Sequence, residues 1–209
     1  MAWHPEILGA RQKRVLDLIG PVLSDRGFYL AGGTAVALHL GHRRSADLDW
    51  FASEGLDDPH ALGAELCEAG IPFQADQIST GTLHGSIRGV RVSLLRFRYP
   101  LLARLRKMPG RIRIAARPDL AAMKLSAVAQ RGAKKDFADI YALAKSGYSL
   151  NRMLGMYQQK FDANDLFHVI YSLTYFADAD HDRMPRMLWS DDWKTMKSTM
   201  RRWVYEIRN

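Results

Sequence analysis

The stretch that decides the fold reads Gly32-Gly33-Thr34-Ala35-Val36-Ala37-Leu38-His39-Leu40-Gly41-His42-Arg43-Arg44-Ser45-Ala46-Asp47-Leu48-Asp49-Trp50-Phe51. Just before it, residues 28–31 form a short apolar run that is typical of a buried strand. Residues 34–40 predict a short helix that ends at Gly41. Residues 47–51 alternate acidic and apolar side chains, as a half-buried strand does. The stretch therefore predicts a strand, a glycine turn, a helix, a polar loop and a second strand.

The glycine pair has a chemical meaning as well as a structural one. Two glycines between a strand and a helix let the backbone turn tightly and approach a ligand closely. The free N–H groups at the start of the helix then face an anion, and Thr34 adds a hydroxyl donor. We expect Gly32, Gly33 and Thr34 to bind phosphate, although an ordinary turn before a helix explains the glycines equally simply.

Asp47 and Asp49 are two residues apart on the second strand, so their carboxylates project from the same face. Two carboxylates at this spacing repel each other and resist full ionisation unless a cation lies between them. Mg²⁺ accepts one or two carboxylates together with substrate phosphates and water. We therefore expect the pair to hold Mg²⁺, or Mn²⁺ in its place. The alternative is an exposed strand edge with two solvated acids.

Composition limits the class of protein. The chain has 209 residues, of which 47% are apolar and 25% charged, which fits one large domain or two small ones. It contains no apolar run long enough to span a membrane, and its N-terminus lacks the pattern of a signal peptide. The single cysteine, Cys67, cannot form an intrachain disulfide and is expected to be partly buried. These features predict a cytoplasmic protein without a membrane partner.

Positive charge is concentrated in one segment. The net charge is +8, and the interval between Asp76 and Asp119 contains no acidic residue. It holds ten basic residues: Arg88, Arg91, Arg96, Arg98, Arg104, Arg106, Lys107, Arg111, Arg113 and Arg117. Arginine grips phosphate with a forked pair of donors, so the segment predicts a groove for a polyanion. Solvated strand and loop faces are the alternative.

The remaining pattern predicts an α+β fold. Before residue 116 we expect helices at 5–26 and 58–69, a hairpin at 82–97 and a strand at 112–115. After it, the sequence predicts helices at 118–131, 135–145, 150–161, 165–177 and 191–207. The expected architecture is a mixed sheet with flanking helices in residues 1–116, followed by an all-helical part in residues 117–209 that packs against it.

The order of these motifs along the chain resembles that of a known enzyme fold. A glycine pair, a spacer and then acid–apolar–acid resembles the polymerase-beta-type nucleotidyltransferase fold. The amino-acid sequence of residues 32–51 is similar to the first motif of the AbiEii/AbiGii toxin family. A second block, Asp119-Leu120-Ala121-Ala122-Met123-Lys124-Leu125-Ser126-Ala127 followed by Arg131-Gly132-Ala133-Lys134-Lys135-Asp136-Phe137-Ala138-Asp139-Ile140-Tyr141, resembles the helical motif of that family. The resemblance covers about residues 28–145, and the last 60 or so residues show no matching motif.

The resemblance implies roles for particular residues. Gly33 and Thr34 would hold the phosphates of a nucleoside triphosphate, and the acid pair would hold the metal. Lys124 matches a helical lysine that would contact the triphosphate, and an ordinary surface lysine is its alternative.

Four further residues of the motifs receive roles. Asp136 and Asp139 match acidic positions that would share a helix face and take part in catalysis; a helix cap is the alternative for Asp136. Arg43 and Arg44 would steady the triphosphate, or belong to a solvated loop.

One position departs from the pattern. Many polymerase-beta-type enzymes place a third carboxylate on a later strand, and residue 93 in the predicted strand is a serine. Either Asp136 or Asp139 replaces it, or water and metal suffice, or activation of the attacking hydroxyl is weak.

The function implied by the resemblance is transfer of a nucleotide from an NTP to an acceptor. The acceptor would be RNA, such as tRNA, and the chain would be the toxin of a toxin–antitoxin or abortive-infection system with a cognate antitoxin protein. A small-molecule nucleotidyltransferase is one alternative, which the basic composition disfavours. A non-catalytic nucleotide- or RNA-binding module that kept the fold is another.

Overall fold

The computed structural model describes residues 2–208. Its centre is a seven-stranded mixed sheet in the order β3-β4-β5-β2-β1-β7-β6. The strands are β1 (Tyr29–Ala31), β2 (Leu48–Ala52), β3 (Phe73–Ser79), β4 (Thr82–Ile87), β5 (Val90–Arg96), β6 (Arg106–Met108) and β7 (Ile112–Ile114). Strand β2 pairs antiparallel with β1 and parallel with β5. Asp49 therefore lies in a strand that is paired on both sides, whereas Asp47 directly precedes that strand.

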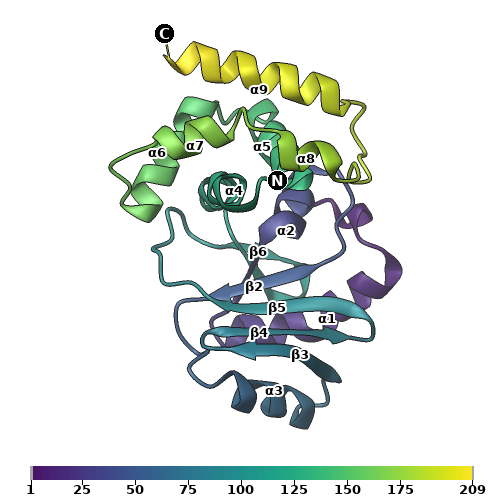
Figure 1. The fold of residues 1–209 in the computed structure, drawn as a ribbon. Coiled ribbons are helices and arrows are strands. Elements are labelled where there is room, and N and C mark those ends of the chain that lie inside the picture. Colours follow the sequence, from purple (N-terminus) through teal and green to yellow (C-terminus); the bar gives the residue numbers. More distant parts are fainter. Residues whose placement is uncertain (1, 209) are drawn as a thin grey trace.

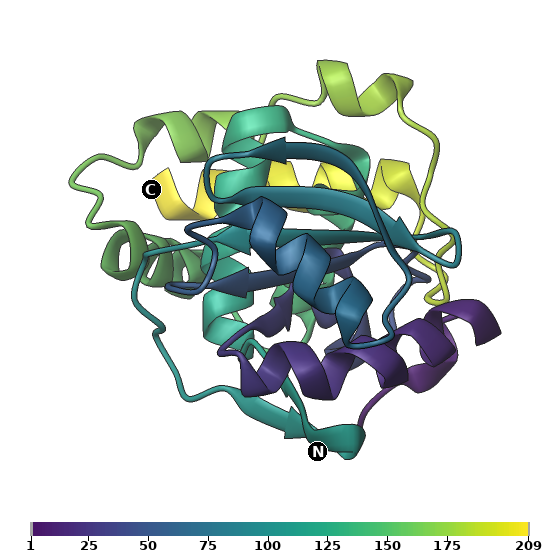
Figure 2. The ribbon, with the colours of Figure 1, turned by 90° about the horizontal axis from the view of Figure 1, so that it is seen from below.

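Helices cover both faces of the sheet (Figures 1 and 2). Helices α1 (Ala10–Asp25) and α3 (Pro59–Glu68) lie on one face. Helix α2 (Gly32–Leu40) lies on the other face, in contact with the first two C-terminal helices. Those two helices are α4 (Arg117–Arg131) and α5 (Lys134–Lys145), and α2 contacts both of them as well as β1 and β2.

From Arg117 onward the regular elements of the described chain are helices. After α4 and α5 come α6 (Leu150–Phe161), α7 (Phe167–Ser172), α8 (Ala177–His181) and α9 (Trp193–Arg208). Helix α9 crosses over α5 and α6, far from the sheet (Figure 1). The predicted α+β class, with a mixed sheet followed by a helical part, is confirmed. The division into residues 1–116 and 117–209 stays a prediction, because both parts share contacts through α2.

Two predicted helices and two strands differ from the expected elements. The helix predicted for residues 5–26 is a 3₁₀ turn (η1, Pro5–Ile7) and then α1, because Leu8 and Gly9 are extended. The helix predicted for 165–177 is interrupted between α7 and α8. Strands β3 and β6 were not predicted. They are the two edges of the sheet, and most of their side chains are exposed, so no apolar alternation marks them.

Two expectations about exposure are wrong. Cys67 on α3 is exposed, although its thiol lies 3.4 Å from the carbonyl oxygen of Phe73. The basic segment of residues 88–117 does not line one groove, because β5 and the β6–β7 pair belong to different parts of the sheet. Arg111, for example, pairs with exposed Asp25 on α1. Within residues 2–208, no helix has both the length and the apolar character of a membrane span.

Candidate active site

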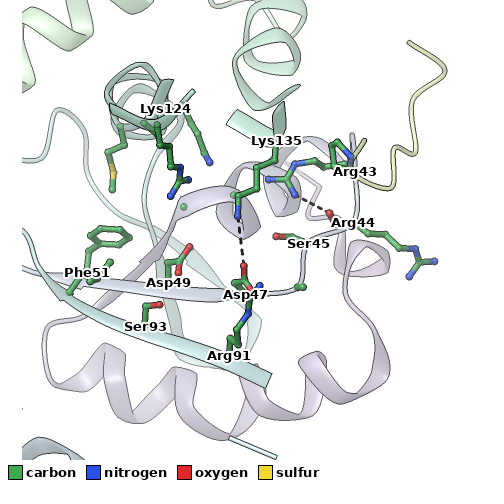
Figure 3. Close-up of a pocket in the computed structure, with 18 of the residues that line it drawn as sticks. Arg43, Arg44, Ser45, Asp47, Asp49, Phe51, Arg91, Ser93, Lys124 and Lys135 are labelled. Atoms are coloured by element: carbon green, nitrogen blue, oxygen red, sulfur yellow. Dashed lines mark hydrogen bonds and ion pairs between the residues drawn. The ribbon is translucent and has the colours of Figure 1, made fainter. Parts of the chain in front are cut away.

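Strand β2 forms the floor of a pocket of about 840 Å³ beneath α4 (Figure 3). Leu48 and Trp50 turn into the core, and both are fully buried. Asp49 and Phe51 point the opposite way and line the pocket, and Asp47 lines it just before the strand begins. The alternation expected of a half-buried strand therefore places both carboxylates on the pocket side.

The first turn of α2 approaches this floor closely. Gly32 has φ +64°, which favours glycine, and a Cβ atom there would lie 2.5 Å from Oδ2 of Asp49. A Cβ atom at Gly33 would collide with Nη2 of Arg43. Both glycines line the pocket. The missing side chains thus leave backbone, at the positive end of a helix dipole, facing the acid pair.

Thr34 does not face the pocket. Its side chain is buried, and its hydroxyl hydrogen-bonds with Oγ of Ser45 (2.7 Å) and with the carbonyl oxygen of Asp47. Ser45 is the residue of this group that lines the pocket. The structure therefore gives Thr34 the task of holding the loop that carries Asp47 and not of donating to phosphate.

Asp47 lies between two cations: Arg91, which belongs to the predicted basic segment, and Lys135, which had no predicted role. Nε and Nη2 of Arg91 on β5 each lie 2.8 Å from Oδ1 of Asp47. Nζ of Lys135, at the start of α5, lies 3.9 Å from Oδ2 (Figure 3). Arg91 remains largely exposed, so solvent screens this pair and leaves the carboxylate available for exchange with a cation.

Asp49 lies deeper than Asp47. Burial raises the pKa of the Asp49 carboxyl above its ordinary value. The Lys124 ammonium and the Ser93 hydroxyl act in the opposite direction, while the charge of Asp47 adds to the increase. Ser93 on β5 stands opposite Asp49 in the strand register, and its Oγ lies 3.0 Å from Nδ1 of His84 on β4. A row of His84, Ser93 and Asp49 thus crosses three neighbouring strands.

Lys124 reaches the pocket from α4, and two buried carboxylates fix it. Its Nζ lies 2.8 Å from Oδ1 of Asp136 and 2.7 Å from Oδ2 of Asp139. Burial alone would lower the pKa of the ammonium, but the two carboxylates outweigh burial and hold that pKa above its ordinary value. Lys124 is therefore a fixed positive charge above Asp49 (Figure 3).

Asp139 joins α5 to the loop that precedes the acid pair. It accepts hydrogen bonds from Nε (2.7 Å) and Nη2 (2.9 Å) of Arg43, and Nε2 of His42 lies 2.8 Å from its Oδ1. Burial opposes ionisation of Asp139, yet Arg43 and Lys124 hold its pKa well below the ordinary value. Burial lowers the pKa of His42, so its imidazole is neutral and donates to Asp139.

Asp136 and Asp139 are both fully buried and do not line the pocket. Asp136 also receives two hydrogen bonds from Arg131, at 2.7 and 3.0 Å. Neither carboxylate can reach an attacking hydroxyl or a metal in the pocket, so neither replaces the carboxylate missing at Ser93. Their geometry fits positioning of Lys124, Arg131 and Arg43.

The pocket is strongly basic. Seven of its lining residues are cationic and two are acidic: Arg43, Arg44, Arg91, Lys124, Arg131, Lys135 and Arg186 against Asp47 and Asp49. Nε of Arg44 is buried and lacks a hydrogen-bond partner in the described chain. A site with this charge suits a polyanionic substrate.

Asp47 and Asp49 are the carboxylates that line this pocket and could bind a metal. No group of three or more His, Cys, Asp or Glu residues is placed to bind a metal within residues 2–208. Two carboxylates that share a pocket face, one of them with a raised pKa, fit a Mg²⁺ ion whose other ligands are phosphate oxygens and water. The donor chemistry therefore fits the predicted ion.

Comparison with known proteins identifies the family. The family model described as "Nucleotidyl transferase AbiEii toxin, Type IV TA system" matches residues 99–204, just over half of the chain. The chain belongs to the AbiEii family. The match contains the Lys124 block and extends through the helices after residue 145, where sequence analysis found no motif. It does not include the glycine pair or the acid pair, which the structure brings to the same pocket.

One sequence relative and one solved structure align with this AbiEii chain over most of its length. An uncharacterized protein, aq_aa25 from Aquifex aeolicus (strain VF5), is 35% identical over 82% of this chain and 84% of its own. The nucleotidyltransferase toxin MenT4 (Rv2826c) from Mycobacterium tuberculosis H37Rv is 16% identical and superposes with a TM-score of 0.63, over 96% of this chain and 84% of its own. That likeness shows the same fold. The similarity to the Megavirus polyadenylate synthase is weaker (TM-score 0.49, 16% identity) and covers 65% of this chain and 31% of that protein.

The AbiEii site unites most residues that the sequence predicted. The predicted residues that line the pocket are Gly32, Gly33, Arg43, Arg44, Asp47, Asp49 and Lys124. The guanidinium of Arg43 is buried and already paired with Asp139. Nε of Arg44 has no hydrogen-bond partner in the described chain, so Arg44 is the arginine with a donor left for a ligand. The AbiEii chain is thus a nucleotidyltransferase whose predicted residues divide into a pocket lining and a buried support.

Several pocket residues were missed. Arg91 was predicted only as part of the basic segment. It lies two positions before Ser93 on the same strand, so strand alternation could have placed it at this site. Lys135 and Arg131 stand within the quoted helical block without having been assigned a role. Arg186 carried no signal in the sequence. It reaches the pocket because its carbonyl accepts the backbone N–H of Arg44 and because Met187 pairs with Arg43.

Proposed function

We propose that this AbiEii nucleotidyltransferase uses Mg²⁺, held by Asp47 and Asp49, to transfer a nucleotide from an NTP to an RNA acceptor such as tRNA. One observation carries the proposal: the acid pair, the glycine opening of α2 and the Lys124 ammonium converge on one basic pocket. The sequence family adds a toxin–antitoxin context, and we propose a cognate antitoxin protein as a partner.

The residues of the pocket can be assigned to steps of the transfer. The backbone of Gly32 and Gly33 would receive phosphate oxygens, and Lys124 and Lys135 would neutralise charge that moves to the leaving pyrophosphate. When bound, the ion would supply further charge neutralisation of the triphosphate. The acceptor hydroxyl would attack the α-phosphorus, forming one P–O bond as the bond to pyrophosphate breaks. Most of the catalysis would come from positioning and electrostatics.

The proton of the acceptor hydroxyl needs a base. Ser93 cannot serve as one at the position of the absent third carboxylate. Asp49 and His84 are the members of its row that can accept a proton, since His84 hydrogen-bonds to Ser93 and Asp49 stands opposite it. We therefore propose that the lack of a third carboxylate is compatible with turnover.

The surroundings of the pocket favour RNA over a small cationic acceptor. The lining holds seven cationic side chains and two acidic ones, and positive charge stays in excess even when the two buried carboxylates that pair with three of these cations are counted. A cationic drug would be repelled by this charge. The side chain of Arg91 is 74% exposed and that of Lys135 is 46% exposed, so both would meet the phosphates of a longer chain at the pocket. A polyanionic acceptor explains this charge, whereas a small-molecule nucleotidyltransferase does not.

A transfer assay tests the proposal. The purified protein is incubated with Mg²⁺, total tRNA and each NTP in turn, radiolabelled at the α-phosphate. We expect labelled RNA, its loss with EDTA, and its loss in the variant Asp47→Ala/Asp49→Ala. Asp76→Ala, at an exposed position on edge strand β3, is the matched control and should label RNA normally.

Two outcomes would count against the proposal. Folded protein that binds Mg²⁺ and NTP but labels no RNA would exclude the RNA acceptor. RNA binding that survives in the double variant, without labelling by the wild type, would favour the non-catalytic binding module.

A further inference from the structure

One end of the pocket is lined by apolar and aromatic side chains, and the other end is lined by charged ones. Phe51, Leu95, Phe97 and Met123 all line the pocket, and each is only partly buried. We call these four residues the aromatic wall. Apolar side chains that stay accessible inside a pocket are characteristic of a ligand-binding surface, because a core position would bury them.

The strand register orders the pocket floor from charge to aromatic surface. Strands β2 and β5 run parallel, with Asp49 opposite Ser93 and Phe51 opposite Leu95. Asp47, which is bonded to Arg91, precedes these rows by one step. Each step is two residues, or about 6.6 Å along the strand. A ligand that lies along β2 with its phosphates at the two aspartates would place its next group over Phe51.

The aromatic wall is built rigidly. The ring of Phe51 stacks on buried Tyr29 (6.2 Å between centroids) and meets the ring of Phe97 edge-on (5.4 Å). Nζ of Lys160 lies 5.3 Å from the centroid of Phe97, and Lys160 is itself fully buried and paired with Asp119 at 2.7 Å. A wall fixed in this way loses little side-chain entropy when a flat ligand stacks on it.

We propose that the aromatic wall binds the nucleobase of the incoming NTP. The proposal rests on the nucleotidyltransferase function proposed above. With the phosphates at Gly32, Gly33 and the acid pair, one ribose bridges the step from Asp49 to Phe51 and brings the base against Phe51 and Phe97. Every nucleobase has a π-face, so stacking here adds affinity for all four NTPs. Preference among the bases then has to come from contacts other than the wall.

The test compares ligands with and without a base. Calorimetry measures the binding of an NTP and of ribose 5′-triphosphate, each with Mg²⁺, to the wild type and to Phe97→Leu. The leucine keeps apolar volume but loses the ring, so we expect NTP to bind about tenfold more weakly. Binding of the base-free triphosphate should not change. Phe167→Leu is the matched control, because Phe167 on α7 is 72% exposed and does not line the pocket.

The outcomes separate this inference from the proposed function. Equal losses for both ligands, or no loss for either, would overturn the aromatic wall as a base site while leaving nucleotide transfer intact. A raised KM for the RNA acceptor with unchanged NTP affinity would assign the wall to a base of the acceptor and also overturn the proposal. Absence of NTP binding by the wild type would overturn the proposed function itself. Thermal unfolding checks each variant, and Phe51→Leu repeats the test if Phe97→Leu does not fold.

Discussion

The buried ion cluster behind the pocket makes a quantitative prediction. Asp139 is fully buried and forms ion pairs with two cations. It accepts two hydrogen bonds from Arg43, and Nζ of Lys124 lies 2.7 Å from it. Asp139→Asn removes the charge and keeps the shape. In this variant Lys124 would keep its ion pair with Asp136. Arg43 would lose its ion pair with Asp139 and has no other one in the described chain.

The cost of this change follows from the burial of the partners. Removing one partner of a buried pair leaves an uncompensated charge and costs about 3–5 kcal/mol. That is a large part of a total stability of roughly 5–15 kcal/mol. For a chain of this size each kcal/mol lowers Tm by about 2–4 °C, so the expected decrease is on the order of 10 °C.

Urea and thermal unfolding, followed by circular dichroism, measure the effect. The control is Asp25→Asn, because Asp25 also receives a two-pronged hydrogen bond from one arginine, Arg111, but both partners are exposed. Its loss should cost less than about 1 kcal/mol. Equal unfolding midpoints for Asp139→Asn and Asp25→Asn would refute the reasoning that burial makes the cluster important.

Two further predictions concern the glycine pair and acid stability. Gly32→Ala should abolish nucleotide transfer, because its Cβ would lie 2.5 Å from Oδ2 of Asp49, whereas Gly70→Ala, also at positive φ but with open space around it, should lose stability only and keep activity in the transfer assay. The pKa values of Asp136 and Asp139 are lower in the folded protein than the unfolded value of about 4, so the stability they provide is complete above that pH and is lost as pH falls through their folded pKa values. Urea midpoints measured from pH 6 downward should therefore decrease below about pH 4. This decrease should be shallower in Asp139→Asn, which keeps only Asp136, and an equally steep decrease would show that Asp139 does not contribute.

The predicted elements succeeded where the local pattern and the burial agree. The strand–glycine–helix–strand unit was predicted within two residues: α2 begins at Gly32 and not at Thr34, while Gly41 does end it in a left-handed conformation and β2 does alternate. The edge strands β3 and β6 escaped prediction because exposed strands need no apolar alternation. The break between α7 and α8 was likewise hidden, because residues on both sides of it remain helical.

The site was predictable in its chemistry and less so in its assignment of roles. Asp47, Asp49 and Lys124 were identified as a phosphate and metal site, and the structure places all three at one pocket. Thr34 and Asp139 were identified from the same motifs, yet both are buried and engaged by protein partners. A motif records that a residue type is needed at a position. It does not record whether the side chain faces substrate or supports a neighbour.

The sequence by itself determined that two carboxylates share one face of a strand and that a glycine pair opens a helix beside them, because both are consequences of local backbone geometry. Only the tertiary structure decided what surrounds them. Lys124 and Arg186 come from segments far along the chain and reach the pocket through packing of α4 and through the pairing of Met187 with Arg43. Burial raises the pKa of Asp49, whereas at Asp139 the charges of Arg43 and Lys124 outweigh burial and lower the pKa. Both shifts are likewise properties of the assembled core, because desolvation and the nearby charges depend on what packs around a carboxylate and not on its immediate sequence.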